Sequence, residues 1–588
     1  MLQPRGRFAY KVKQASAEPA KPLIQYLDHV THKGAVYTDT PPVKTNDAAP
    51  KASLNLPPSM RARFEKKEAQ FVPSAQQQAL FDWIQHGKGN AILLAAAGCG
   101  KTTTLIQALR FMEGTIFFGA YNKSAADDIY AKAKAAHALA RGLRISTVHA
   151  AGYGDFMRAF PRTAVDDRKV SKIVDDYKMV RDDKALIEQA RGFIIKMVSF
   201  SKQFLIGCRG KPASNHMPVW VSLANYFGTD ADLTDDIGVE QALSWVIDVF
   251  EKSRAQCVAG LIDFDDMIYA PIAYGVSLFP NHWVLIDEAQ DINPARRELA
   301  KRLMRAGARA IFVGDNRQSV YGFTGAGGDA IERIREEFNC TVLPLTVTYR
   351  CPKSVVNYAH KWVGAEHIQA HETAPDGIVR PVVYDVAEKK DADDKPLPIM
   401  PWFVQDPPAK QDVILCRYTR PLIQTAYSMI KEGVACKVEG RDIGLGLISL
   451  ARMWKISTIT RLEERLERYL KREIEKAQAA QSDRREQEVT DKVTTLRIII
   501  ERCKARGKQS ILELVLEIET MFQDNVTDCV RLSTGHKSKG REWNRVFWLQ
   551  HMQRKCRKEW EDMQEDNICY VIATRAKHEL VLVPEMKL

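Results

Sequence analysis

Residues 91–105 read AILLAAAGCGKTTTL, an apolar run followed by small residues and Gly-Lys-Thr. Residues 91–94 are apolar, as in a buried strand, and the small residues that follow lead into a helix. Strand, glycine-containing turn and Gly-Lys-Thr in this order predict a phosphate-binding loop, whose backbone N–H groups point at phosphate oxygens. The strict pattern has Gly where this chain has Ala95. The alternative is a strand-to-helix turn in which Gly-Lys-Thr occurs by chance, and the order of the three parts argues against it.

Each residue of this loop has an expected role. Lys101 is expected to reach the β- and γ-phosphates of a nucleotide, and the hydroxyl of Thr102 is expected to bind Mg²⁺. The helix that begins here directs the positive end of its dipole at the anion. The residues predicted to bind the nucleotide phosphates are Ala97, Gly98, Cys99, Gly100, Lys101, Thr102 and Thr103.

The composition is that of a globular protein with several domains. The chain has 588 residues, of which 45% are hydrophobic and 27% charged, and at this length about three or four domains are expected. No run of 18 uncharged apolar residues occurs, so no membrane span is expected. The net charge of +12 favours a polyanionic partner such as a nucleic acid. The 11 cysteines never form a C-x-x-C pair, which favours reduced thiols over a zinc or iron–sulfur site.

A second signal lies at residues 283–291, WVLIDEAQD, where an apolar strand ends in two adjacent carboxylates. Asp287 is expected to hold Mg²⁺ through water, and Glu288 to orient and deprotonate the attacking water. On a surface loop such a pair would carry little information. At the end of a buried strand downstream of a phosphate-binding loop, it indicates a nucleotide hydrolase. The 186 residues from Lys101 to Asp287 are more than such a core needs and predict an inserted subdomain.

A third segment, residues 310–323, reads AIFVGDNRQSVYGF. A strand ends in Gly-Asp, and Gln318 stands where an amide could sense the γ-phosphate. Tyr321 and Phe323 are aromatic residues on a polar, glycine-containing loop. They either pack in a satellite core or stack on nucleic-acid bases.

Polar residues also follow two other predicted strands. Residues 116–120 run into Tyr121 and Asn122, and residues 144–149 end in His149. Polar side chains at strand ends of an α/β sheet commonly line a ligand crevice. Upstream, Ser74 is expected to cap a helix in which Gln77 offers an amide that matches the edge of adenine, although such a helix start can equally be a solvated cap.

These segments together resemble the UvrD/Rep-like branch of superfamily 1 DNA helicases over about residues 71–583. The stretches similar to its motifs I, Ia, Ib, II and III are AAAGCGKTTT, YNKSAA, STVHAAG, IDEAQD and VGDNRQSVYGF. Those similar to motifs IV, V and VI are LTVTYR (residues 345–350), LSTGHKSKGREWNRV (532–546) and NICYVIATRAK (567–577). Three sequence segments resemble the F-box DNA helicase and phage-encoded relatives, namely FDDMIYAP, GHKSKGREW and VEGRDIG.

The resemblance implies roles for further residues. Tyr349 would stack on adenine while Gln77 reads its edge, and Glu542 would contact the ribose. Arg350 and Arg575 would reach the γ-phosphate from a second core, because a planar guanidinium holds charge and geometry together. With these two arginines, the implied catalytic set comprises Lys101, Glu288, Gln318, Arg350 and Arg575. The residues implied to face DNA are Tyr121, Asn122, His149, Tyr321, Phe323, Thr534 and His536.

Three positions depart from the family pattern. Ala120 stands where an aromatic residue is usual, Thr324 where motif III has Arg, and Gly535 precedes His536 in motif V. All three concern contacts with DNA rather than the chemistry of ATP.

The implied fold is α/β, with two RecA-like P-loop domains that have parallel sheets and each carry a mostly helical insertion. Residues 1–69 are expected to be a flexible N-terminal tail. The predicted first core comprises residues 70–152 and 256–345, with a helical insertion at 153–255. The predicted second core comprises 346–441 and 525–588, with a short charged helical insertion at 442–524. In that insertion Thr460 to Glu463 is expected to form a capping box, followed by the ion pairs Glu464/Arg468 and Glu467/Lys471.

The implied function is that of an ATP- and Mg²⁺-dependent DNA helicase. It would move 3′→5′ along single-stranded DNA and unwind duplexes at junctions of single- and double-stranded DNA in replication, repair or recombination. One alternative is a DNA-stimulated ATPase that displaces proteins with little unwinding, and another is a nucleic-acid-binding regulator without catalysis; RNA also stays open as a substrate. The tail is a candidate site for a protein partner. The expected location is the cytoplasm of a bacterial or phage-infected cell, or the nucleus of a eukaryote.

Overall fold

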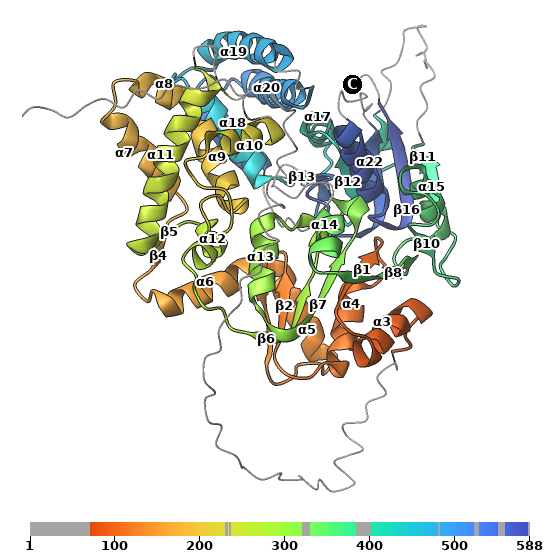
Figure 1. Ribbon diagram of the computed structural model, residues 1–588. Helices are drawn as coiled ribbons and strands as arrows, with labels where there is room; N and C mark the ends of the chain where they lie inside the picture. The colour runs from red at the N-terminus through yellow and green to blue at the C-terminus, as the bar shows by residue number, and fades with distance from the viewer. Residues whose placement is uncertain are drawn as a thin grey trace, which may run out of the picture.

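Two parallel six-stranded sheets organise the structure. The computed structural model describes residues 71–227, 229, 233, 237–319, 330–383, 401–479, 483–522, 528–550 and 559–585. Figure 1 shows the first sheet below, the second at the upper right, and groups of helices at the left and top. The predicted α/β fold with two parallel sheets is confirmed.

The first sheet has the strand order β3-β2-β6-β7-β1-β8. Its strands pair in parallel, with Leu93 of β1 opposite Val313 of β7. The inner strands are continuous apolar runs because both faces of the sheet are covered. The six strands are β1 (Asn90–Ala95), β2 (Ile116–Ala120), β3 (Leu143–Thr147), β6 (Asn281–Ile286), β7 (Met304–Gly314) and β8 (Cys340–Leu345).

Successive residues of each strand serve opposite faces of this sheet. On β2, Phe117 belongs to a core that continues into the helices inserted between β3 and β6. Phe118 belongs to the core on the other face, beneath α3 (Ala75–His86), α4 (Lys101–Ala108) and α5 (Lys123–Ala135). The strand ends that carry the predicted site therefore stand on a sheet that is held from both sides.

The helices between β3 and β6 form a large lobe beside the first sheet (Figure 1). The helix expected around residues 241–250 is α11, with Trp245 and Phe250 buried on its inner face. We call α7–α11 the first insertion. The helices of this region are α6 (Val148–Ala159), α7 (Lys169–Met179), α8 (Lys184–Gln189), α9 (Arg191–Gln203), α10 (Met217–Phe227), α11 (Val239–Val258) and α12 (Asp266–Ala273).

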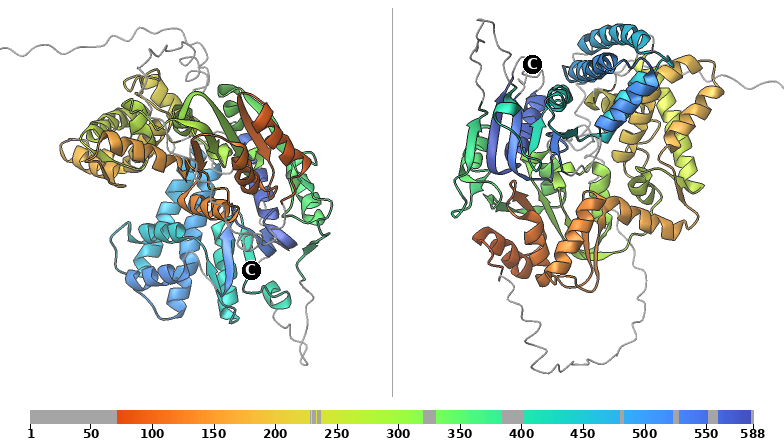
Figure 2. Two further views of the ribbon diagram at one scale, coloured as in Figure 1. Left: turned by 90° about the horizontal axis from the view of Figure 1, so that it is seen from below. Right: turned by 180° about the vertical axis from the view of Figure 1, so that it is seen from behind.

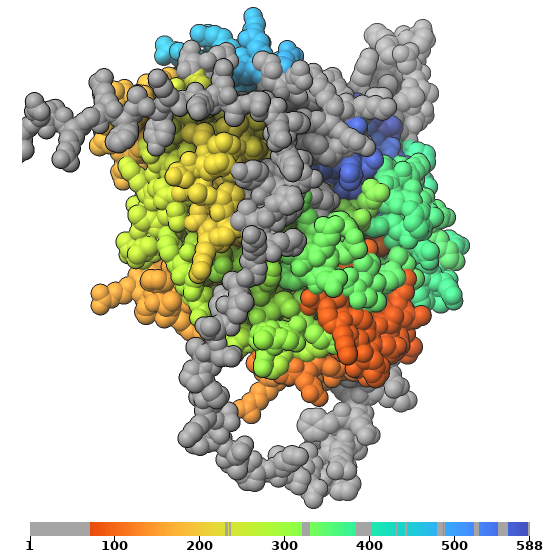
Figure 3. All heavy atoms as spheres, in the orientation of Figure 1, coloured from red at the N-terminus to blue at the C-terminus, as the bar shows by residue number. Residues whose placement is uncertain are grey.

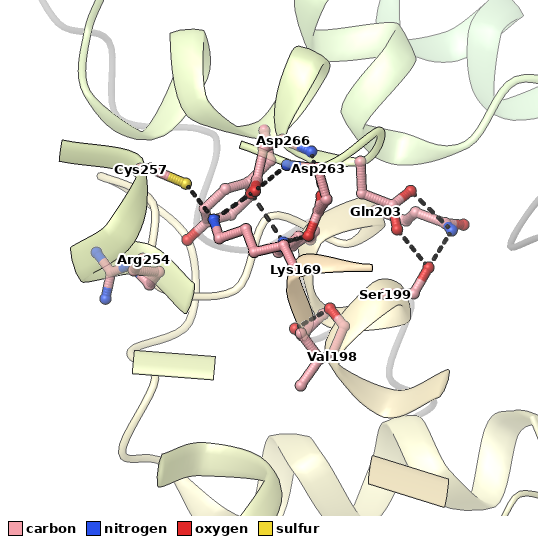
Figure 4. A network of polar contacts seen from close by, with 12 residues as sticks. Lys169, Val198, Ser199, Gln203, Arg254, Cys257, Asp263 and Asp266 are labelled. Atoms are coloured by element: carbon pink, nitrogen blue, oxygen red, sulfur yellow. Dashed lines mark hydrogen bonds and ion pairs between the residues drawn. The ribbon is translucent and has the colours of Figure 1, made fainter. Parts of the chain in front are cut away.

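A network of buried charges joins the first insertion to α12 (Figure 4). The ammonium of Lys169 lies 2.7 Å from Asp266 and 3.1 Å from the thiol of Cys257. Lys202 lies 2.9 Å from the other oxygen of Asp266 and also pairs with Asp263. Two cations and two carboxylates thus balance each other where water has no access, as buried charges must.

The second sheet has the strand order β11-β16-β15-β12-β14-β13 and is also parallel. Its two faces are covered by different helices, since the adjacent residues Phe547 and Trp548 belong to two separate buried cores. The strands are β11 (Ile378–Pro381), β12 (Val413–Cys416), β13 (Cys436–Val438), β14 (Val530–Thr534), β15 (Trp543–Gln550) and β16 (Ala576–Pro584). The main covering helices are α15 (Lys353–Val363), α17 (Thr419–Lys431) and α22 (Glu559–Ala573).

A second group of helices, α18–α21, follows β13, and we call it the second insertion. Figure 2 shows that both insertions lie to one side of the two sheets. The helices are α18 (Arg441–Arg452), α19 (Ile459–Ala479), α20 (Asp483–Ala505) and α21 (Ile511–Met521). In the described part of the chain, no helix combines the length and the apolar character needed to cross a bilayer.

Three details predicted for the second insertion are wrong. α19 begins at Ile459, so Thr460 lies inside its first turn and cannot cap it. The capping box of this region is instead formed by Ser510 and Glu513 of α21. Glu467 pairs with Arg497 of α20 rather than with Lys471. Arg468 donates to the backbone carbonyl of Glu464 rather than to its carboxylate, at 3.3 Å. Packing of α19 against α20 thus overrides the pairing expected of an isolated helix.

The buried charges of the first insertion generate a test of stability. Lys202→Met leaves Asp263 and Asp266 without one of their cations, and we expect the local unfolding free energy of α9 to fall by about 3–5 kcal/mol. Lys132→Met is the control, because Lys132 and its partner Asp128 are exposed, and it should cost less than about 1 kcal/mol. Hydrogen exchange of the helix amides measures both. Equal effects of the two substitutions would contradict the role of burial.

Candidate active site

The phosphate loop lies between β1 and α4, at the carboxyl edge of the first sheet. Gly98 has a φ of +73° and Gly100 a φ of +80°, backbone conformations that residues with a side chain rarely adopt. Gly100 caps α4, so the free N–H groups of that helix point out of the turn. The structure thus brings residues 97–103 together at a helix N-terminus, the arrangement that binds phosphate.

The ammonium of Lys101 is buried and has no hydrogen-bond partner among the described residues. Burial alone would lower the pKa of Lys101, but the carboxylates of Glu288 and Asp315 raise it above its ordinary value. Lys101 is therefore a charged donor with its hydrogen-bonding capacity unused, directly at the loop. A phosphate group fits this donor, because charge-assisted hydrogen bonds are the strong ones.

Asp287 and Glu288 follow β6 and sit beside this lysine. Burial and the charge of Glu288 raise the pKa of Asp287 to about 6. Burial would also raise the pKa of Glu288, yet the charges of Lys101 and Lys539 hold it below its ordinary value. The hydroxyl of Thr102 acts in the opposite direction and lowers the pKa of Asp287. Hydroxyl and carboxylate oxygens suit Mg²⁺, so these two residues fit the predicted metal site.

The backbone of Glu288 is strained, with a φ of +52°. Its carboxylate accepts a hydrogen bond from the side chain of Gln290, whose own oxygen accepts the N–H of Asp315 at 3.0 Å. Gln290 therefore ties the carboxylate pair to the end of β7. Strain of this kind is held in place only where the surrounding contacts fix it.

The second core lies directly against the phosphate loop, and the two cores touch in the space-filling view (Figure 3). The N–H of Tyr349 donates to the carbonyl of Gly98 at 3.0 Å. A Cβ on Gly98 would lie 2.6 Å from the hydroxyl of Thr348, so only glycine allows this approach. Ala96 and Ala97 belong to the apolar core of the second domain. The loop is thus enclosed by both cores.

Arg350 and Arg575 both reach this interface, but each holds a partner within the second core. Arg350 donates to Glu542 at 2.5 Å. Arg575 is buried and donates to the carbonyls of Val571 at 2.8 Å and Arg541 at 3.1 Å. Burial and the charge of Arg350 lower the pKa of Arg575 to about 10. The predicted approach of both arginines to a γ-phosphate stays a prediction.

The residues expected to contact the adenine and the ribose lie close to the phosphate loop. They differ in how many contacts they already make within the protein. Ser74 caps α3, as predicted, in a capping box with Gln77. The amide of Gln77 also donates to Thr104 at 2.9 Å, so both of its ends are engaged within the protein. Tyr349 is 48% exposed and its ring packs against His371 at 4.8 Å. An exposed aromatic face suits stacking, whereas adenine recognition by Gln77 stays a prediction.

A pocket leads from the carboxylate pair toward residues expected to face DNA. Its lining comprises Ala120, Tyr121, Val148, His149, Ile286, Asp287, Glu288, Ile292 and Arg296. The guanidinium of Arg296 lies 5.7 Å from the ring centre of Tyr121. His149 stacks on Phe264 at 4.4 Å, and Phe264 is itself 58% exposed. Arg296 and Phe264 were not predicted from the sequence, because neither stands at a recognisable strand end.

Of the remaining residues expected to contact DNA, the structure describes Asn122, Thr534 and His536. Asn122 caps α5 by accepting the N–H of Ala125 at 2.8 Å. Thr534 ends β14 and is buried, and His536 is half-buried just after it. Gly535 between them lies against α22, where a Cβ would stand 2.8 Å from the side chain of Ile572. This close packing explains why the position is occupied by glycine. Tyr321, Phe323 and Thr324 lie outside the described residues.

Lys539 is a functional candidate that the sequence did not single out. Its buried ammonium donates to Asp291 at 2.5 Å and to the carbonyl of Gln318 at 2.9 Å. It thereby connects the second core to two segments of the first. In the sequence it is one of several basic residues between positions 536 and 541, and nothing local distinguishes it from a solvated lysine.

The burial of His149 generates a pH prediction. Burial and the charge of Arg296 lower the pKa of His149 to about 3. The unfolded chain therefore binds a proton below a pH of about 6.5 that the folded chain does not bind. The contribution of His149 to the free energy of unfolding is fully present above that pH. It is lost as the pH drops toward 3, and the loss is about 2 kcal/mol at pH 5. Thermal unfolding of His149→Gln should lack this part of the pH dependence, while the exposed control His86→Gln should keep it; equal slopes in all three proteins would contradict it.

Comparison with known proteins places this site in a family. The family model for the UvrD/REP helicase N-terminal domain matches residues 75–339, and that for the UvrD-like helicase C-terminal domain matches residues 447–585. The ATP-dependent DNA helicase Rep of Escherichia coli is 25% identical over 314 residues, which cover 48% of this chain and 42% of the relative.

Two further relatives match to a similar extent. The Rep helicase of Buchnera aphidicola from Schizaphis graminum is 23% identical over 302 residues, 47% of this chain and 42% of the relative. DNA helicase II of Haemophilus influenzae is 24% identical over 297 residues, 47% of this chain and 38% of the relative. The aligned part is thus less than half the length of each of these relatives. The two family models together match more than half of the chain, and the chain belongs to the UvrD/Rep-like superfamily 1 helicases.

Proposed function

We propose that this chain hydrolyses ATP with Mg²⁺ and uses the reaction to move 3′→5′ along single-stranded DNA and to unwind duplexes. The observation that carries this proposal is the buried ammonium of Lys101, which has no hydrogen-bond partner among the described residues. It stands at a phosphate loop, beside Asp287 and Glu288 and beneath the second core. The relatives, ATP-dependent DNA helicase Rep and DNA helicase II, support DNA as the substrate.

Different residues of the first core have different roles in hydrolysis. Lys101 and the N–H groups of the loop hold the β- and γ-phosphates, and Thr102 and Asp287 hold the metal. Mg²⁺, when bound, neutralises charge on the phosphate oxygens. Glu288 is kept anionic by neighbouring lysines and accepts the proton of the attacking water. Gln318 orients that water from the end of β7.

The second core supplies positive charge to the same reaction. Arg350 and Arg575 act on the γ-phosphate oxygens, where a guanidinium contributes both charge and direction. Because the donors come from two cores, hydrolysis needs the cores together, and product release allows them to part. Repeated closing and opening of this cleft advances the strand.

The DNA would run over the pocket that begins at the carboxylate pair. Phe264, which is exposed and stacks on the buried ring of His149, offers an aromatic face there together with Tyr121. Base stacking on such faces contributes about 1–3 kcal/mol per base. The net charge of +12 supports contacts with backbone phosphates that do not depend on base sequence.

The wider setting follows from the relatives. They are bacterial, which supports a location in the cytoplasm of a bacterial or phage-infected cell and a role in replication, repair or recombination. Residues 1–69 are our candidate for contact with a protein partner.

The first experiment measures ATP turnover with and without single-stranded DNA. We expect DNA to stimulate the wild type, and Glu288→Gln to lower the stimulated rate by about 10²–10⁴-fold because the general base is lost. Glu332→Gln is the matched control, since Glu332 pairs with Arg335 on an exposed helix face, and it should keep full activity. A wild type without turnover in either condition would contradict the motor function.

Unwinding of duplexes with a 3′ or a 5′ tail then tests the direction of movement. Faster separation of the 3′-tailed duplex is the expected result. Strong DNA-stimulated turnover without unwinding of either duplex would instead favour an ATPase that displaces proteins.

A further inference from the structure

Four side chains of the second core hold one short segment of the first, residues 315–319 at the end of β7. This segment carries Gln318. The four contacts are His367 to Asp315 at 2.9 Å, Tyr570 to Asp315 at 3.3 Å, Lys539 to the Gln318 carbonyl at 2.9 Å and Asn567 to the Ser319 carbonyl at 3.0 Å.

The carboxylate of Asp315 is the centre of this arrangement. Its side chain is fully buried. One oxygen accepts the ring N–H of His367 and the backbone N–H of Arg317, the latter at 3.0 Å. The other accepts the hydroxyl of Tyr570 and, at 2.7 Å, the amide N–H of Gln318. The orientation of the Gln318 amide is therefore set by a carboxylate that two residues of the other core hold in place.

The hydrogen bond from the amide nitrogen to Asp315 also determines which atom of Gln318 can contact the attacking water. With one N–H of its amide bonded to Asp315, the amide oxygen is the group of Gln318 that can accept a hydrogen bond from a water in the cleft. That is the role expected of a glutamine beside a general base, which must orient the water and not move its proton.

Tyr570 connects the same carboxylate to the phosphate loop. Its hydroxyl accepts the N–H of Ala97 at 2.9 Å while it donates to Asp315. Burial raises the pKa of Tyr570 well above its ordinary range, so the phenol is neutral and can accept and donate at once. The ring of His367 stands edge-on against that of Tyr570 at 5.6 Å. Both residues belong to the second core, so these contacts form only when the cores are closed.

We propose that Tyr570 and His367 are positioning residues that act through Asp315 to aim Gln318 at the attacking water when the cores close. Nucleotide binding to the first core alone would leave Gln318 without this support, and closure would complete it. The inference rests on the proposed ATPase function and adds how the second core switches hydrolysis on. It concerns the rate of the chemical step rather than nucleotide affinity.

The test begins with Tyr570→Phe, which removes the hydroxyl and keeps the buried ring. We expect the DNA-stimulated kcat to fall about tenfold, as for loss of a hydrogen bond to a charged group, with the KM for ATP changed less than about threefold. Tyr177→Phe is the matched control, because the hydroxyl of Tyr177 also donates to a carboxylate, that of Asp248 at 2.6 Å, but in the first insertion. This control should keep the wild-type kcat.

A double-mutant cycle with Gln318→Ala separates positioning from general support. If Tyr570 acts through Gln318, Tyr570→Phe should slow the Gln318→Ala enzyme no further. The same factor of loss in both backgrounds, or an unchanged kcat in Tyr570→Phe, would overturn the inference. An inactive wild type would instead refute the proposed function itself.

His367 gives an independent arm should Tyr570→Phe fold poorly in thermal unfolding. His367→Gln keeps an N–H donor for Asp315 and should retain most of the stimulated kcat. His367→Ala lacks the donor and should lose about as much as Tyr570→Phe. Equal activity of these two variants would overturn the inference.

Discussion

The buried ammonium of Lys101 is the constraint on which the rest of the site depends. A buried charge is stable only with opposite charges close by. Asp287 and Glu288, on the loop after β6, and Asp315, on the loop after β7, supply them. Those carboxylates need donors in turn, and the ammonium of Lys539 and the ring N–H of His367 approach from the second core. The balance of charge in the nucleotide site is therefore shared between the cores, and separating them exposes or unpairs groups on both sides.

The parts of this site that depend on local chain geometry could be predicted from the sequence. The phosphate loop, the carboxylates after β6 and the cap at Ser74 each follow from a short pattern, and the structure has all three. The contacts of Tyr570 with Ala97 and of Lys539 with Asp291 could not be predicted, since their partners lie hundreds of residues away. A sequence pattern states which residues share a helix face, but not which two faces meet.

The first insertion is also connected to the catalytic edge by polar contacts. The side chain of Ser199 on α9 donates to Asp265 at 2.5 Å, and Gln203 on the same helix accepts from Asn293 at 3.3 Å. Asn293 caps α13 (Pro294–Arg302), which carries Arg296 of the DNA-side pocket. Because the buried charges around Lys202 fix α9 to α12, a shift of the insertion would be felt at α13. The long spacer between Lys101 and Asp287 is thus a fixed part of the site and not a loose appendage.

The two arginines of the second core differ in how easily they can move. Arg350 is held by a single pair with Glu542, whose side chain is 41% exposed, and such pairs contribute at most about 1 kcal/mol. Arg575 is buried and uses its donors on two carbonyls and a hydroxyl, which would be left unsatisfied if it swung away. A nucleotide whose ribose binds Glu542 would therefore release Arg350 from its ion pair at a small cost in free energy. Arg575 would keep its present hydrogen bonds and act on the phosphate without moving. Closure of the cleft then needs one arginine to turn and the other only to be carried along with its core.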